Sequence, residues 1–212
     1  MQKPNLIFDF DGTIANTLYV GVDIYNRVAH EYGCKKVHHK DTKAFQGKKP
    51  FDLMKELEVS LLNLPLLLLR VRNELFSEIR DVETFDGINE VLHTLKEMGY
   101  NLGVVTSNSQ KNVEHFFEEH GLDNIFSSIH TSKHLFGKHK VIAKYIRQHG
   151  IAKDKAIYIG DEARDIEATQ KIGIPIIAVS WGFNSRDVLE MYEPFAIVDS
   201  PAELLNKILS IP

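Results

Sequence analysis

Four short segments of this 212-residue chain carry residue types that suit chemistry on a phosphate group. Three of them follow apolar runs typical of buried strands: DFDGT at Asp9–Thr13, TSN at Thr106–Asn108 and GDEARD at Gly160–Asp165. The fourth is Lys138, which begins a predicted helix within the sequence FGKHK. Ligands of open α/β sheets bind outside the carboxyl ends of the strands. We therefore expect these segments, which are far apart in the sequence, to meet in one crevice.

The acidic residues of these segments suit a hard cation. Asp9, Asp161 and Asp165 offer anionic oxygens of the kind that bind Mg²⁺. A magnesium ion neutralises phosphate charge and so allows a carboxylate to approach the anion. The pattern therefore predicts a Mg²⁺ site.

The remaining residues suit the phosphate itself. Thr106 offers a hydroxyl, and the backbone N–H groups of Ser107 and Asn108 follow it at the start of a predicted helix, a favourable place for an anion. Lys138 supplies a positive charge for the equatorial oxygens. Gly12 permits a tight turn that brings further N–H groups close to the phosphate.

Taken singly, these signals differ in strength. A DxDGT segment can form a surface turn, because Asp and Gly favour turns. A GDxxxD segment can simply cap a helix, and a single lysine is usually solvated. Their occurrence together, each at the end of a predicted strand or the start of a predicted helix, favours a functional site.

Short β-rich runs alternate with helical stretches along most of the chain. The predicted strands are 5–10, 101–107, 155–161 and 174–180, with weaker candidates at 127–130 and 196–198. The predicted helices are 87–98, 109–120, 138–149 and 163–172, and each is followed by a glycine able to cap it. Continuous apolar runs suit strands that are covered on both faces. The alternation predicts an α/β fold with a doubly wound parallel sheet.

One stretch interrupts this alternation. Residues 17–83 contain no convincing strand, and helical patterns occupy 19–32, 51–57 and 61–79. We interpret this stretch as an all-helical cap domain inserted after the first strand. The predicted domains are an α/β core of residues 1–16 and 84–212 and a helical cap of residues 17–83.

Composition excludes several other classes of protein. The formal net charge is −4, so there is no basic excess to indicate a nucleic-acid partner. The longest apolar run, 61–69, is too short to span a bilayer, so no membrane partner is expected. The single cysteine, Cys34, cannot form an internal disulfide, and a cytoplasmic location is expected.

The motifs resemble those of the haloacid dehalogenase-like hydrolase superfamily, in its phosphoglycolate phosphatase and β-phosphoglucomutase-like branch. The resemblance covers essentially the whole chain and rests on DFDGT, VVTSN, Lys138 and IGDEARD. It implies a Rossmann-like core with a helical cap inserted just after the first motif. It also implies a phosphatase that acts on a small phosphorylated metabolite. The dehalogenases of the superfamily lack the second aspartate, so Asp11 argues against dehalogenation.

The resemblance also implies a role for each motif residue. Asp9 is the expected nucleophile, which forms an aspartyl phosphate, and Asp11 is the expected general acid and then general base. The expected Mg²⁺ ligands are Asp9, the backbone carbonyl of Asp11, and Asp161, while Asp165 acts through water or by orienting Lys138. Glu162 is a candidate to orient these metal ligands without binding the metal itself. The expected phosphate-binding residues are Asp11, Gly12, Thr106, Ser107, Asn108 and Lys138.

Several alternatives stay open. Close relatives often read Lys-Pro-x-Pro where this chain reads GKHK, and Lys140 is the rival to Lys138 for the motif lysine. A sugar-phosphate mutase would use the same core, and a catalytically idle sensor would bind a phosphometabolite or a protein. A phosphonoacetaldehyde hydrolase would need a cap lysine that cannot be identified. The 181–183 segment could line the crevice but suits ordinary packing better, and the histidines lack metal-site spacing. The sequence identifies neither the substrate nor the oligomeric state.

Overall fold

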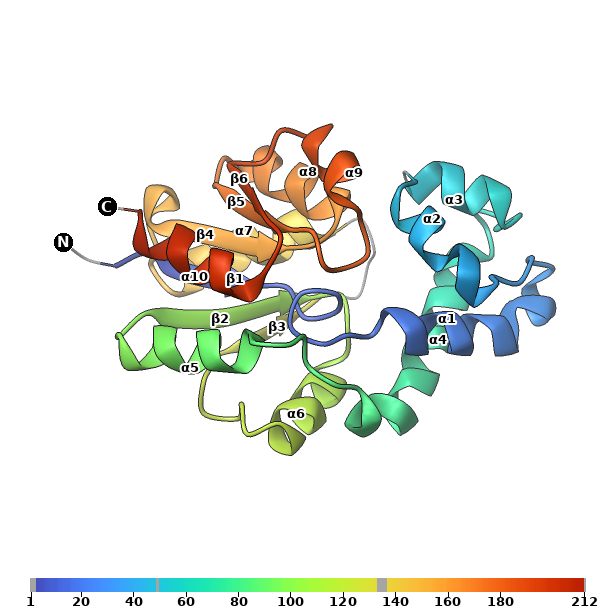
Figure 1. Cartoon of the computed structure of the whole chain (residues 1–212), viewed down its shortest axis with the longest axis horizontal. Helices are drawn as coiled ribbons and strands as arrows, with labels where there is room; N and C mark the ends of the chain where they lie inside the picture. Colours follow the sequence, from blue (N-terminus) through green and yellow to red (C-terminus); the bar gives the residue numbers. More distant parts are fainter. Residues whose placement is uncertain (1–2, 49, 133–136, 212) are drawn as a thin grey trace.

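The protein is built around a six-stranded sheet in the order β3-β2-β1-β4-β5-β6, with every neighbouring pair parallel (Figure 1). The computed structural model describes residues 3–48, 50–132 and 137–211. The strands are β1 Asn5–Phe8, β2 Asn101–Thr106, β3 Ile129–Thr131, β4 Ala156–Gly160, β5 Ile176–Val179 and β6 Ala196–Val198. The predicted doubly wound parallel sheet is confirmed.

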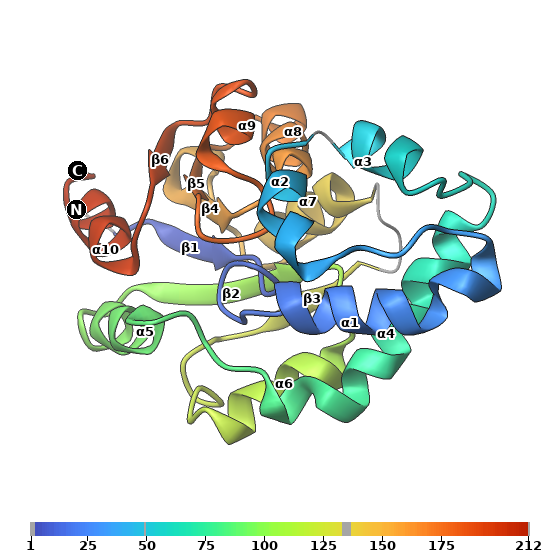
Figure 2. The ribbon, with the colours of Figure 1, turned by 45° about the vertical axis from the view of Figure 1, so that its right-hand side comes forward.

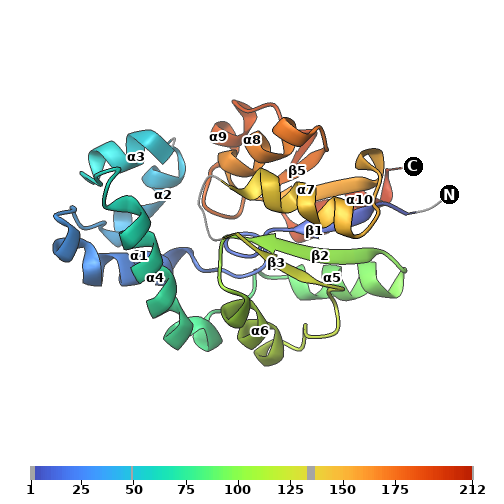
Figure 3. The same ribbon diagram turned by 180° about the vertical axis from the view of Figure 1, so that it is seen from behind.

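Both faces of the sheet are buried, as the continuous apolar runs predict. In β1, Leu6 and Phe8 belong to one apolar cluster and Ile7 belongs to the other. Residues of α5, α6 and α10 complete the first cluster, and residues of α7, α8 and α9 complete the second. Figure 3 shows α7 and α8 on the opposite side of the sheet from α5 and α6. These helices are α5 Ile88–Glu97, α6 Gln110–Glu119, α7 Lys138–Gln148, α8 Ala163–Ile172, α9 Arg186–Glu190 and α10 Pro201–Leu209.

The described residues between β1 and α5 are helical wherever they form regular structure. The α-helices here are α1 Leu18–Val28, α2 Thr42–Gln46, α3 Pro50–Glu56 and α4 Leu64–Glu78, with short 3₁₀ turns between them. Helix α1 packs along α4, and the two are joined by ion pairs from Arg27 to Glu74 (3.5 Å) and Glu78. This helical segment lies beyond the carboxyl ends of the strands, on the side away from both chain termini (Figures 1 and 2).

The chain leaves and re-enters the α/β part at one place. Ala15 forms an isolated bridge with Thr84, and Asn16 N–H donates to the carbonyl of Glu83 at 2.9 Å. The two connections between the α/β part and the helical segment therefore lie side by side. No helix in the described part of the chain is long and apolar enough to cross a membrane.

The predicted elements match the structure to within a few residues at their ends. The four glycines expected to end helices, at positions 99, 121, 150 and 173, all have positive φ between 62° and 81°. Helices α2, α9 and α10 were not predicted from the sequence.

Candidate active site

The site lies where the order of the strands reverses. Strand β1 pairs with β2 on one side and β4 on the other, and the chain winds outward in opposite directions from these two. Asp9 follows β1, Thr106 ends β2, and Asp161 follows β4. Asp9 N–H donates to the carbonyl of Ile159 at 2.8 Å, so the pairing of β1 with β4 continues to the first aspartate. Ligands of open α/β sheets bind at such a switch point.

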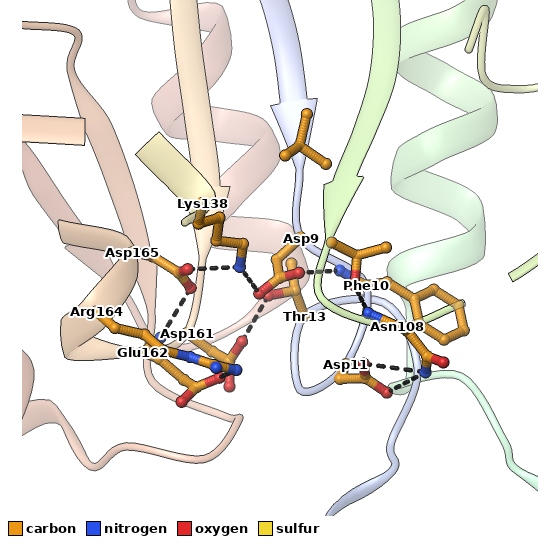
Figure 4. A network of polar contacts seen from close by, with 12 residues as sticks. Asp9, Phe10, Asp11, Thr13, Asn108, Lys138, Asp161, Glu162, Arg164 and Asp165 are labelled. Atoms are coloured by element: carbon orange, nitrogen blue, oxygen red, sulfur yellow. Dashed lines mark hydrogen bonds and ion pairs between the residues drawn. The ribbon is translucent and has the colours of Figure 1, made fainter. Parts of the chain in front are cut away.

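Three carboxylates from different segments meet there. Asp9, Asp161 and Asp165 are buried, and each has an oxygen within 4.8 Å of an oxygen of the others. The ammonium group of Lys138, also buried, contacts both Asp9 and Asp165 (Figure 4). The sequence-predicted acidic residues and the predicted lysine are thus in one cluster.

Hydrogen bonds orient the first two carboxylates. Asp9 Oδ1 accepts from Phe10 N–H at 2.8 Å, while its Oδ2 faces Lys138. Asp161 Oδ1 accepts from the hydroxyl of Thr13 at 2.8 Å. Asp161 Oδ2 accepts from the backbone N–H of Phe183 at 2.7 Å. Each oxygen therefore has a donor already in place.

Asp165 lies between Lys138 and the start of α8. Its Oδ1 accepts from Lys138 at 2.5 Å, and its Oδ2 accepts from the backbone N–H of Glu162 at 3.3 Å as part of a capping box. Glu162 is itself paired with Arg164. Asp165 therefore contacts Lys138, as one of the two roles considered for it from the sequence requires.

Burial and neighbouring charges shift the pKa values of the residues in this cluster. Burial raises the pKa of Asp9 to about 7; Lys138 opposes this shift and Asp165 adds to it. Burial, followed by the charges of Glu162 and Asp9, raises the pKa of Asp161 well above its ordinary range. Burial alone would lower the pKa of Lys138, but Asp165 and Asp9 together raise it, so the lysine stays charged. Three carboxylates face a single ammonium group, and a divalent cation with oxygen ligands fits this donor set.

Two glycines allow the chain to approach Asp161 closely. Gly12 has φ +74°, and a Cβ there would lie 2.1 Å from Asp161 Oδ2. A Cβ at Gly182 would lie 2.3 Å from the same oxygen. Any larger residue at either position would displace the carboxylate. The sequence-predicted role of Gly12 as a tight turn agrees with this geometry.

Asp11 is held apart from the acidic cluster. Both of its carboxylate oxygens accept from the side-chain amide of Asn108 at 3.0 Å, toward which Asp11 is turned in Figure 4. Burial raises the pKa of Asp11 to about 6, against the opposing effect of the hydrogen bonds from Asn108. Asn108, which was expected among the phosphate-binding residues, therefore has its side chain committed to Asp11.

The other residues of the second motif lie beside the cluster. Thr106 is fully buried, and its hydroxyl accepts from Asn108 N–H at 3.0 Å. The hydroxyl oxygen of Ser107 is buried and has no hydrogen-bond partner within the described part of the chain. Lys140 is exposed and has no ion pair among the described residues.

In residues 3–48, 50–132 and 137–211, the acidic triad is the only cluster of potential metal ligands. His134, one of the histidines considered from the sequence, lies outside the described residues.

The loop after β5 contributes more than the packing role expected for it. Phe183 N–H holds Asp161, Asn184 N–H donates to the carbonyl of Asp161 at 3.3 Å, and Asn184 Oδ1 accepts from Ala163 N–H at 2.9 Å. The amide of Gln46, from α2, donates to the carbonyl of Gly182 at 2.6 Å. The only sequence signal for this loop is its place after a strand at the same edge of the sheet.

Comparison with known proteins places this arrangement in a family. The sequence profile of the haloacid dehalogenase-like hydrolases matches residues 6–179. The phosphoglycolate phosphatase of Synechococcus elongatus is 29% identical over 206 residues, with 97% of each chain covered. The pyrophosphatase PpaX of Bacillus cereus is 27% identical over 209 residues, with 97% of this chain and 96% of that protein covered.

Solved structures share the fold over the whole chain. A predicted phosphatase from Clostridium acetobutylicum superposes with a TM-score of 0.84 at 25% identity, covering 99% of this chain and 100% of the other. A haloacid dehalogenase-like hydrolase from Streptococcus pneumoniae has a TM-score of 0.79 at 23% identity, with 97% and 98% covered. These matches confirm that the motifs resemble those of the haloacid dehalogenase-like hydrolases. They also confirm the prediction that the protein is an enzyme, a hydrolase of the phosphatase type. The chain belongs to the haloacid dehalogenase-like hydrolase family.

Proposed function

We propose that this protein is a Mg²⁺-dependent phosphatase that hydrolyses small phosphate monoesters through a phospho-aspartate at Asp9. The observation that carries the proposal is the contact set of Asp9. Its buried carboxylate follows β1, touches Lys138, and lies within 4.8 Å of Asp161 and Asp165. A nucleophile, a fixed positive charge and additional acidic ligands are what in-line phosphoryl transfer requires.

The proposed residue roles follow the chemistry of a two-step displacement. A carboxylate oxygen of Asp9 attacks phosphorus, a new P–O bond forms, and the ester P–O bond breaks. Protonated Asp11 gives its proton to the departing alkoxide oxygen. Ionised Asp11 then takes a proton from the water that attacks the aspartyl phosphate, which releases phosphate and restores Asp9. A pKa of about 6 lets Asp11 occupy both protonation states near neutral pH.

Lys138 and Thr106 hold the phosphate in this scheme. The ammonium group of Lys138 is fixed by Asp165 and can stabilise charge on the equatorial oxygens. The hydroxyl of Thr106 and the N–H groups at the start of α6 provide further donors. Mg²⁺ would be held by Asp9, Asp161 and the carbonyl of Asp11, with Asp165 at its margin, and when bound it supplies positive charge that offsets the repulsion between carboxylate and phosphate.

Residues 17–83 are proposed to act as a cap over this site. The segment lies beyond the carboxyl ends of the strands, where the acidic cluster lies, and Gln46 contacts the loop that holds Asp161 (Figure 2). A cap in this position would close the site against water and select the substrate.

Two substrate classes are favoured by specific relatives. The 29% identical relative is named a phosphoglycolate phosphatase, which favours a small phosphorylated carboxylic acid. The 27% identical relative is named a pyrophosphatase, which makes inorganic pyrophosphate the second candidate. A sugar-phosphate mutase and an idle sensor remain the alternatives that use the same core.

The experiment is a screen of the purified protein with Mg²⁺ against a panel of phosphorylated metabolites. The panel includes phosphoglycolate, inorganic pyrophosphate, sugar phosphates and nitrophenyl phosphate. Release of free phosphate supports the proposal, and the preferred compound identifies the substrate class. Isomerised sugar phosphate without free phosphate would favour the mutase, and binding without turnover would favour the sensor.

A further inference from the structure

A buried asparagine behind the site has no role in the steps above. Asn112 lies in α6 and is 1% exposed. Its side-chain nitrogen donates to Asn108 Oδ1 at 2.8 Å and to the backbone carbonyl of Arg72 at 3.3 Å. Both partners are acceptors, so the amide of Asn112 is fixed with its nitrogen pointing between them.

The contact fixes the next amide in turn. Asn108 Oδ1 accepts from Asn112 and also from Ser109 N–H at 2.7 Å. With its oxygen held by two donors, Asn108 must present its nitrogen on the other side, where it donates to both oxygens of Asp11 at 3.0 Å. The hydrogen bonds form one polarised chain with a single direction of donation, from Asn112 through Asn108 to Asp11.

Asn112, from which this series of hydrogen bonds begins, also donates to the helical segment. The carbonyl of Arg72 belongs to the interior of α4, so it gives Asn112 a partner that depends on the position of the helix and not on a side chain. A buried series of hydrogen bonds is rigid when every donor and acceptor in it has a partner. If one amide is reversed, two acceptors or two donors face each other, and the loss of hydrogen bonding destabilises the fold. The orientation of Asp11 is therefore tied to the packing of α4 against α6.

We propose that Asn112 is a positioning residue for Asp11: it fixes the Asn108 amide, which in turn orients the Asp11 carboxyl group. The inference rests on the proposed function, in which Asp11 protonates the departing alkoxide. In the first step, enzyme phosphorylation, loss of that positioning must slow only those reactions in which the leaving group needs a proton. A purely structural asparagine would affect all substrates alike.

The test is rapid-quench measurement of the first step, enzyme phosphorylation, with an alkyl phosphate and with nitrophenyl phosphate. Asn112→Asp keeps the shape but places a carboxylate oxygen against Asn108 Oδ1, and Asn112→Leu removes the donors without adding charge. General acids contribute about 10²–10⁴-fold, so Asn112→Asp should slow phosphorylation by the alkyl ester about tenfold or more. Phosphorylation by nitrophenyl phosphate, whose leaving group departs without a proton, should change little. Asn112→Leu should show the same selectivity with a smaller loss.

The matched control is Asn26→Asp in the helical segment. The side-chain amide of Asn26 donates to the carbonyl of Val37 and accepts from the N–H of Val37, both at 2.7 Å. Asn26 is not part of the series of hydrogen bonds that leads to Asp11. It should alter both substrates equally or neither. Equal losses with both substrates in the two Asn112 variants would overturn the inference while the enzyme itself remained active. Wild-type protein that forms no phosphoenzyme would instead contradict the proposed function, and the inference with it.

Discussion

The ammonium nitrogen of Lys138 lies 2.5 Å from Oδ1 of Asp165, and both side chains are buried. Asp165 is in turn held by the backbone at the start of α8, through Glu162 N–H. The positive charge beside Asp9 is therefore fixed by a helix terminus and does not depend on a flexible surface side chain. Electrostatic groups that are oriented before reaction contribute most to catalysis.

Substitution of Lys138 should be far more damaging than substitution of Lys140. Loss of a preorganised charge typically costs on the order of 10²–10³ in kcat, and Lys138→Ala should fall in that range. Lys140 is exposed, so Lys140→Ala should retain nearly full kcat. Steady-state kinetics with one preferred substrate compares the two variants. The opposite ranking would identify Lys140 as the motif lysine.

The same substitution should also change stability. Removing one partner of a buried ion pair typically costs about 3–5 kcal/mol, because the remaining charges are left without compensation. Lys138→Ala leaves Asp9 and Asp165 facing each other without Lys138, so denaturant unfolding in EDTA should show a loss of this order. Unchanged stability of Lys138→Ala would contradict the charge-compensating role of Lys138.

Activity should depend on a divalent cation. EDTA should abolish turnover, and Mg²⁺ should restore it, because three buried carboxylates otherwise face one ammonium group. Ca²⁺ should inhibit, since its larger and looser coordination shell distorts in-line geometry. Asp161→Asn should respond weakly to added Mg²⁺. Full turnover of the wild type in EDTA would rule out a metal role for Asp9.

The stabilisation conferred by Mg²⁺ should grow with pH. The pKa of Asp9 is raised from its ordinary 3.8 to about 7, and that of Asp161 is raised as well. At pH values between the ordinary and the raised pKa of Asp9, the metal-free folded protein binds more protons than the unfolded chain. The stability of the metal-free protein therefore falls as pH rises through this range. A cation needs the carboxylates deprotonated, so the Tm difference between Mg²⁺ and EDTA should be larger near about pH 8 than near about pH 5. Asp161→Asn should reduce this difference, and a pH-independent one would contradict the assignment.

The sequence predicted those parts of the fold in which local pattern and burial coincide. Helix α8 has its predicted bounds, because its apolar spacing ends at a glycine, Gly173, with φ +71°. Helix α2 was missed because five residues are too few to show a helical period. Helix α10 was missed although Ser200, whose side chain accepts from Glu203 N–H at 3.3 Å, precedes Pro201 in a normal start signal.

The site could be predicted in part for a similar reason. The alternation predicts a parallel sheet, so the residues that follow its strands are expected at one edge; that Asp9 and Asp161 follow neighbouring strands is known only from the structure. The hold on Asp161 by Phe183 uses a backbone N–H that any residue except proline provides, so no side-chain type marks it. The pairing of Asn108 with Asp11 depends on how α6 packs, and motif spacing carries no information about that contact.

Replacement of Asp11 should separate its two roles. Asp11→Asn keeps the shape but can neither protonate an alkoxide nor accept a proton from water. With an alkyl phosphate the first step should slow and little phosphoenzyme should form. With nitrophenyl phosphate, stopped-flow absorbance should show a burst of nitrophenolate of about one equivalent, followed by slow turnover. Steady turnover near the wild-type rate with both substrates would remove Asp11 from the reaction.

The most direct test is to identify the residue that carries phosphate during turnover. The enzyme is mixed with substrate and Mg²⁺, quenched in acid within a single turnover, and reduced with borohydride, which converts an aspartyl phosphate to homoserine. Mass spectrometry of the digested protein should find homoserine at position 9 and nowhere else, and Asp9→Asn should yield none and release no phosphate. Phosphate release by Asp9→Asn at the wild-type rate, or homoserine at another aspartate, would contradict the account.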